Sequence, residues 1–147
     1  MIRHAEVELI RLPLPKPMAT ALHRTASVFC ALLTVETDDA RGESFVFSLN
    51  RDRAIALKYM IQSLSHIYVG QPAVDVAQLW HRAMTDINPV GTRGFAVSAI
   101  TAWDTAVWDA LGHATDEALV ARFGQQRDRI PAYASSGLWL NQSTDAL

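Results

Sequence analysis

The chain has little of what marks disulfide-rich, strongly charged or secreted proteins. Its 147 residues include one cysteine, Cys30, so no disulfide can form within the chain, and we expect a buried, unreactive thiol. The 13 basic and 15 acidic residues are mixed along the sequence, which argues against nucleic acid or an anionic membrane as a partner. The amino terminus lacks the apolar segment of a signal peptide, so a cytoplasmic location is expected.

The motifs that identify many enzymes are also missing. The sequence has no phosphate-binding loop, no glycine-rich dinucleotide fingerprint, no His-Glu-x-x-His zinc helix and no Gly-x-Ser-x-Gly nucleophile turn. Its five histidines are scattered over different segments. Half of the residues are apolar and about a fifth are charged, which is typical of one globular domain.

The first fifty residues show the pattern of an antiparallel sheet. Apolar and polar residues alternate over residues 4–9, which predicts a half-buried strand that ends at Pro13 and Pro15. Residues 27–36 are apolar on both faces and predict a central strand covered on both sides. Turn-forming residues then precede a third alternating strand at residues 45–49, which completes a three-stranded meander.

From Asn50, a candidate helix N-cap, the apolar spacing becomes helical. Helices are predicted over residues 54–64 and 76–84, each with an apolar stripe. A third, at residues 93–111, is apolar nearly all round, as a buried central helix would be, with Gly112 as its expected end.

The residues after the third predicted helix show only short apolar segments. A short helix is expected at residues 115–123, followed by a polar linker and a short apolar strand at residues 130–134. That strand has no pairing partner except the distant meander, which indicates that the sequence stops in the middle of a fold.

The third helix carries two carboxylates and two of the tryptophans. Asp104 falls on its inward stripe and should therefore have an arginine, a backbone N–H or a hydroxyl as partner; a structural anchor is favoured over a catalytic acid or base. Asp109 is five residues further on, so the two carboxylates diverge around the helix and form no metal site. Trp80, Trp103 and Trp108 are expected in the core rather than around a ligand.

His23 and Arg24 belong to residues 16–25, which have no clear periodicity and are expected to form a loop. Two hypotheses remain open for this pair. They are solvated loop residues, or they recognise an anionic or polar substrate.

The segment Ala99–Gly112, which reads Ala-Ile-Thr-Ala-Trp-Asp-Thr-Ala-Val-Trp-Asp-Ala-Leu-Gly, resembles the helix signature of the mandelate racemase and muconate lactonizing enzyme family of the enolase superfamily. Residues 11–17, 42–47 and 129–135 resemble the family's first-strand exit, third strand and first barrel strand. The resemblance implies an α+β fold in which residues 1–125 form the capping domain, a three-stranded antiparallel meander followed by a helical bundle. Residues 126–147 would begin a truncated TIM barrel.

The resemblance also implies a function, that of a Mg²⁺-dependent racemase or sugar-acid dehydratase that abstracts the proton α to a carboxylate. The bases and metal ligands lie on later barrel strands in this family, so no catalytic or metal residue is expected here and the chain alone should be inactive. A small carboxylic acid, the chain's own barrel domain and further copies in a homo-oligomer are the implied partners. Carried over to this sequence, the substrate-facing residues are Thr20, His23, Arg24, Leu49, Asn50, Ser135 and Ser136.

Arg24 offers a fork of donors that suits a polyhydroxy acid better than an aryl acid, which favours a sugar-acid substrate. The alternative from another class is a stand-alone protein-binding or assembly module whose exposed apolar faces bind a partner.

Overall fold

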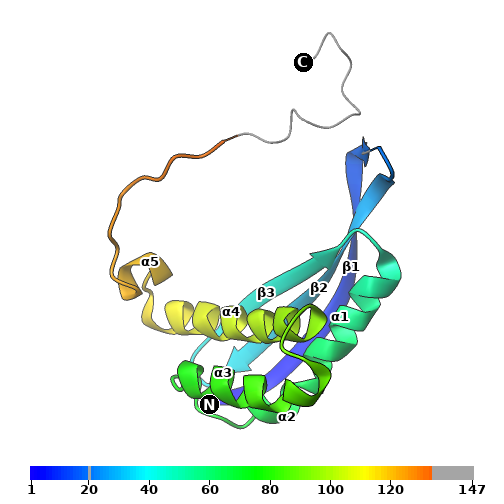
Figure 1. Cartoon of the computed structure of the whole chain (residues 1–147). Helices are drawn as coiled ribbons and strands as arrows, with labels where there is room; N and C mark the ends of the chain where they lie inside the picture. The colour runs from blue at the N-terminus through cyan, green and yellow to red at the C-terminus, as the bar shows by residue number, and fades with distance from the viewer. Residues whose placement is uncertain (20, 134–147) are drawn as a thin grey trace.

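The computed structural model describes residues 1–19 and 21–133. Its sheet has three antiparallel strands in the order β1-β2-β3, namely β1 (Ile2–Ala19), β2 (Arg24–Thr37) and β3 (Arg41–Ser48) (Figure 1). The expected three-stranded meander is therefore confirmed. Thr20, Ala134, Ser135 and Ser136 lie outside the described residues.

The helices follow the sheet in sequence and cover one of its faces (Figure 1). They are α1 (Arg51–Ser63), α2 (Ser65–Tyr68), α3 (Val76–Asp86), the 3₁₀ turn η1 (Asn88–Val90), α4 (Phe95–Thr115) and α5 (Leu119–Arg122). Between sheet and helices lies a single apolar core, to which β1, β2 and the helices α1 to α4 contribute. This arrangement confirms the α+β class.

β1 does not end at Pro13 as the sequence predicted. Pro13 still pairs with Ser27, and after an irregularity the ladder resumes with Met18 opposite Thr25 and Ala19 opposite Arg24. β1 is an edge strand, so one side of its backbone has no strand to bond, and proline is tolerated there. The expected loop at residues 16–25 is therefore mostly the far end of a long hairpin.

β2 is central, as expected, but the described chain covers only one of its faces. Leu33 and Val35 are buried in the core beneath the helices. On the opposite face, Phe45 and Phe47 of the neighbouring strand are 63% and 59% exposed. The prediction of a sheet covered on both sides is wrong for the residues that the structure describes.

The start of α1 follows the sequence prediction. The Asn50 side chain accepts a hydrogen bond from the backbone N–H of Arg53 at 3.1 Å, which satisfies one of the free donors of the first turn. The helix then buries Ala54, Leu57 and Ile61.

α4 is longer than expected, because Gly112 lies inside the helix rather than at its end. The helix continues to Thr115 and is capped by Asp116 in the left-handed conformation, with φ 50°. The carbonyl of Gly112 accepts the N–H of Glu117 at 3.0 Å, as the chain turns back on the helix. A Cβ at position 112 would lie 3.1 Å from the Glu117 carbonyl oxygen, so glycine leaves room for this reversal rather than stopping the helix.

The structure shortens the last predicted helix to α5 and places no strand at residues 130–133. Residues 124–133 are all exposed and extend away from the carboxyl end of α4 (Figure 1). A short apolar segment without a neighbouring strand gains no ladder hydrogen bonds, which explains why the predicted strand does not form.

β3 and α4 approach each other closely at Gly42. A Cβ there would lie 2.1 Å from the Ala106 carbonyl oxygen, so only glycine fits. Beside it, the N–H of Glu43 donates to Asp109 at 2.8 Å, and the buried Ser44 hydroxyl donates to the Ala102 carbonyl at 2.6 Å. These contacts fix the central helix on the third strand.

The aromatic residues take the core positions that the sequence predicted. Trp103 is fully buried, donates its indole N–H to the Ile61 carbonyl at 2.9 Å and stacks on Tyr68 with ring centroids 4.5 Å apart. Trp80 and Trp108 are half-buried against the same core. Cys30 is buried as predicted, and burial raises the pKa of its thiol. Within the described part of the chain, no helix combines the length and hydrophobicity that crossing a bilayer requires.

Candidate functional site

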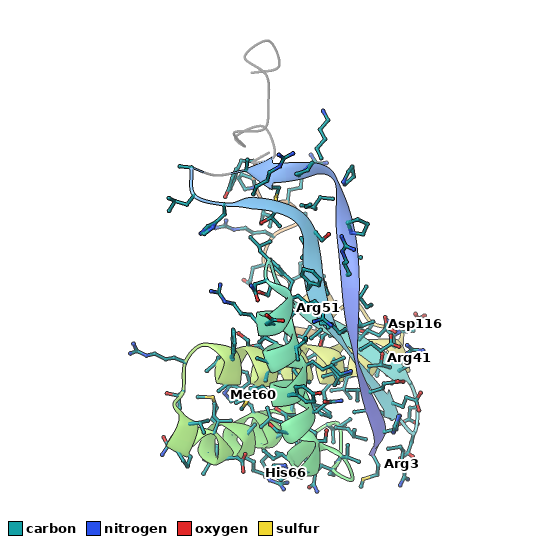
Figure 2. The ribbon with its side chains drawn as sticks, turned by 90° about the vertical axis from the view of Figure 1, so that its right-hand side faces the viewer. Arg3, Arg41, Arg51, Met60, His66 and Asp116 are labelled. Carbon is teal, nitrogen blue, oxygen red and sulfur yellow. The ribbon has the colours of Figure 1, made fainter. Side chains whose placement is uncertain are left out.

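The β1–β2 hairpin projects beyond the rest of the domain. The β2–β3 ladder ends at the pair Phe29–Ser48, whereas the β1–β2 ladder continues to Ala19–Arg24. β2 therefore runs five residues past β3, roughly 16 Å at about 3.3 Å per residue. Figure 2 shows this hairpin bending over above Arg51, the first residue of α1. The tip is thus free of the core and available to contact something else.

The tip carries two cations around one hollow. Lys16, Pro17, Ala19 and Arg24 line a hollow of about 420 Å³. Lys16 and Arg24 are both exposed, and within residues 1–19 and 21–133 neither forms an ion pair. Two unpaired cations beside a concave surface can bind a carboxylate or several hydroxyl groups.

The structure brings some of the predicted substrate-facing residues together and separates others. His23 lies in the turn directly before Arg24, so both belong to the tip. Leu49 and Asn50 follow β3 at the same end of the sheet, but they lie at the base of the projecting hairpin. Leu49 is exposed, while the Asn50 side chain is used to cap α1. Their proposed contact with substrate remains a prediction.

Sequence reasoning missed Lys16. It was grouped with the prolines as part of a strand exit, and nothing in the local pattern distinguishes it from a solvated lysine. Only the pairing of Ala19 with Arg24 brings the two strands together so that Lys16 and Arg24 line one hollow. A long hairpin was not expected because two prolines interrupt the pattern.

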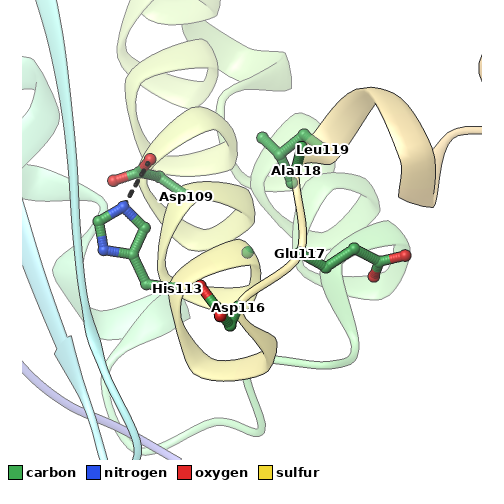
Figure 3. Close-up of a pocket in the computed structure, with 7 residues that line it drawn as sticks. Asp109, His113, Asp116, Glu117, Ala118 and Leu119 are labelled. Atoms are coloured by element: carbon green, nitrogen blue, oxygen red, sulfur yellow. Dashed lines mark ion pairs between the residues drawn. The ribbon is translucent and has the colours of Figure 1, made fainter.

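A second hollow, of about 460 Å³, lies at the carboxyl end of α4 (Figure 3). Two of its three acidic residues, Asp109 and Glu117, are already engaged. One oxygen of Asp109 accepts the Glu43 N–H, the other lies 3.7 Å from His113 Nε2, and Glu117 pairs with Arg122 at 3.2 Å. Asp109 therefore joins α4 to β3.

Magnesium, which the resemblance implies for the whole enzyme, does not fit the residues described here. No group of three or more histidine, cysteine, aspartate or glutamate side chains within residues 1–19 and 21–133 could hold a metal ion. Mg²⁺ binds through several oxygen ligands. No step of a reaction therefore passes through a metal bound by these residues.

Asp104 does not have the partner that the sequence led us to expect. It is half-buried, and no hydrogen bond or ion pair to it is found among the described residues, while Asp109 receives the backbone N–H. Burial raises the pKa of Asp104, and the same carboxylate adds to the effect of burial in raising the pKa of Tyr68. The helix is rotated so that Trp103, Ala106 and Ala110 face the core, which leaves Asp104 at its margin.

Comparison with known proteins identifies a family whose fold is the one described above. The family model for the N-terminal domain of mandelate racemase / muconate lactonizing enzyme matches residues 4–124. The chain therefore belongs to this family and forms its N-terminal domain. Over 137 residues it is 28% identical to 3,6-anhydro-alpha-L-galactonate cycloisomerase of Streptomyces coelicolor, covering 91% of this chain and 38% of that protein. It is 30% identical over 81 residues to L-rhamnonate dehydratase of Saccharopolyspora erythraea, covering 54% of this chain and 21% of the dehydratase.

Solved structures show the same fold. A racemase from Streptomyces coelicolor with bound magnesium superposes with a TM-score of 0.70 at 25% identity, over 76% of this chain and 32% of that one. L-talarate dehydratase from Polaromonas, complexed with Mg and L-glucarate, superposes with a TM-score of 0.78 at 22% identity. The match covers 86% of this chain and 36% of the dehydratase. The chain thus spans less than two fifths of the length of these relatives.

Proposed function

We propose that this chain is the capping and specificity domain of a Mg²⁺-dependent enzyme that abstracts the proton α to a carboxylate, as a racemase or a sugar-acid dehydratase. The bases and metal ligands belong to a barrel domain, which this domain contacts, and the hairpin tip faces the substrate. The family match over residues 4–124, on a chain that spans under two fifths of its relatives, supports this division of labour. The magnesium-bound relatives support the metal.

The single observation that carries the role of this domain is the projecting hairpin with its cationic hollow. Lys16 and Arg24 stand outside the core and form no ion pair within the described chain, so folding does not explain them. Each guanidinium or ammonium donates to oxygen atoms, so the pair is suited to a substrate with several hydroxyls or a second carboxylate. An aryl acid would instead need apolar walls. We therefore propose a sugar acid as the substrate.

The experiment is Arg24→Ala in the enzyme that joins this domain to its barrel. Removing a charge-assisted hydrogen bond costs about 1.5–3 kcal/mol, so kcat/KM for a polyhydroxy acid should fall roughly ten- to a hundredfold. Turnover of mandelate, which has no distal polar groups, should change little. The free energy of unfolding should stay the same, because Arg24 is exposed.

Arg93→Ala is the matched control, because Arg93 is an exposed arginine in the turn before α4 and does not line the hollow at the tip. It should leave kcat/KM unchanged for every acid. If Arg24→Ala turns over its best acid as well as the unaltered enzyme, Arg24 is only a solvated residue and the sugar-acid proposal fails.

A further inference from the structure

The β1–β2 hairpin has no acidic residue anywhere over residues 9–35. Its arginines and lysines in this range are Arg11, Lys16 and Arg24, which give it a net charge of +3. The rest of the chain carries −5, and the two parts together give the total of −2. Charges of one sign reinforce each other's field, so this projection attracts anions although the chain as a whole is acidic.

An irregularity in β1 accounts for the position of Lys16 beside the hollow at the tip. The ladder breaks after Pro13 and resumes at Met18, and between these two pairs β1 has four residues while β2 has only Ala26. Two of the four are prolines, which have no N–H to give to the ladder, and Lys16 stands between them. Extra residues of this kind bend a strand and redirect a side chain out of the regular alternation.

Lys16 and Arg24 face the hollow with no anion to separate them. The four described residues that line it, Lys16, Pro17, Ala19 and Arg24, include no carboxylate. Two like charges repel each other, and a ligand with a full negative charge offsets this repulsion, whereas a hydroxyl group does not. A carboxylate also has two oxygens, which can accept from the guanidinium fork and the ammonium at once. The hollow therefore suits a carboxylate better than a hydroxyl group.

The tip suits a small molecule better than a macromolecule. The hollow of about 420 Å³ falls within the roughly 300–1,000 Å³ that is typical of small-molecule sites. Residues 14–26 contain no phenylalanine, tyrosine or tryptophan. Such rings anchor many protein interfaces and stack on the bases of single-stranded nucleic acids. The tip thus has the charges for a small anion and lacks the rings that a protein or nucleic acid partner would use.

We propose that Lys16 and Arg24 together bind the second carboxylate of a sugar diacid, a polyhydroxy chain with a carboxylate at each end. This inference rests on the proposed function, in which the carboxylate next to the reacting carbon belongs to the barrel side and the hairpin tip faces the rest of the substrate. A sugar monoacid presents a neutral hydroxyl to the tip and leaves both cations without a counter-charge. The inference narrows the sugar acid to a diacid and adds Lys16 as a residue that determines specificity.

The first test uses the 147-residue chain alone and does not depend on catalysis. Gluconate and glucitol share their carbon chain and hydroxyl groups and differ at one end, a carboxylate against a hydroxymethyl group. In NMR titrations at constant ionic strength, gluconate should shift the backbone amides around Lys16 and Arg24 and bind about tenfold or more tightly than glucitol, because its hydrogen bonds are charge-assisted. Gluconate that binds no better than glucitol would overturn the inference.

The second test uses the enzyme that joins this domain to its barrel. We expect kcat/KM to be about tenfold or more higher for six-carbon sugar diacids than for the monoacids of the same configuration. Lys16→Met removes the charge at a similar side-chain length, so it should lower kcat/KM for the diacid about tenfold and leave the monoacid unchanged. Lys16→Arg keeps the charge and should retain the preference for the diacid.

Lys58→Met is the matched control, because Lys58 is the other lysine of the chain, is half-buried on α1 and does not line the hollow. It changes the net charge by the same amount and should alter neither gluconate binding nor the preference for the diacid. An enzyme that turns over monoacids as well as diacids, or a Lys16→Met variant that slows both alike, would overturn this inference while the proposed function stands. An enzyme that acts on no carboxylic acid would overturn both.

Discussion

The contact between β3 and α4 can be tested with one methyl group, by the substitution Gly42→Ala. Gly42 is buried in the middle of this contact, and the added Cβ would lie 2.1 Å from the Ala106 carbonyl oxygen and 2.4 Å from the Ala110 nitrogen. Both are backbone atoms of α4, so no side chain can rotate to make room. Either the helix or the strand must move.

The expected loss of stability depends on the contacts that this movement breaks. Overpacking a well-packed core costs about 1–3 kcal/mol. Moving α4 from β3 also stretches the hydrogen bond from the Glu43 N–H to the Asp109 carboxylate, of a class that contributes about 1.5–3 kcal/mol. We expect a loss of about 2.5–6 kcal/mol in the free energy of unfolding, a large part of the roughly 5–15 kcal/mol by which a typical protein of this size is stable.

Urea denaturation followed by circular dichroism measures this loss as a change in the free energy of unfolding. Gly112→Ala is the matched control, since it adds the same methyl group within α4. There the nearest atom is 3.1 Å away, and alanine gains about 1 kcal/mol of helix propensity, so the net change should stay within about 1 kcal/mol. If Gly42→Ala is as stable as Gly112→Ala, the close approach of α4 to β3 is wrong.

Two further predictions concern single polar groups. The buried Tyr68 hydroxyl has no hydrogen-bond partner among the described residues, so Tyr68→Phe should keep the stacking on Trp103 and raise stability by about 1 kcal/mol, or about 2–4 °C in Tm. Lower stability would reveal a partner for the hydroxyl. Hydrogen bonds from Arg3 and the terminal amine lower the pKa of Asp38 to about 2. The ionised Asp38 therefore contributes to the stability of the folded state. This contribution to stability is present above the ordinary pKa of 3.8 and is lost as pH falls through about 2, so Asp38→Asn should remove it. An NMR titration that gave the Asp38 carboxyl a pKa near 3.8 would contradict these hydrogen bonds.

Local patterns were enough to predict the elements whose cause is local. Asn50 was identified as an N-cap because the cap needs only a side-chain oxygen and the N–H three residues later. α3 begins at Val76, where the apolar stripe of the sequence begins, and the alternation around Val7 gave the first strand. Arg24 stood out as a charged residue outside any periodic segment, although the structure makes it the first residue of β2 rather than part of a loop.

Only the tertiary structure decided the features that depend on distant neighbours. Pro13 lies within a strand because β1 is at the edge of the sheet, a position that no local pattern reveals. The apolar stripe predicted that Asp104 faces inward with a partner and that Asp109 diverges from it, yet the rotation of α4 gave Asp109 the backbone N–H of Glu43 and left Asp104 at the margin.

The candidate site shows the same division. The sequence indicated Arg24, but pairing across the hairpin was needed to place Lys16 beside it around one hollow. Likewise, the apolar residues on both faces of β2 predicted two covered faces, and only the position of the helices showed which face the described chain leaves uncovered. A sequence pattern records that a side chain avoids water, whereas the layer that excludes the water comes from residues far along the chain or from another molecule.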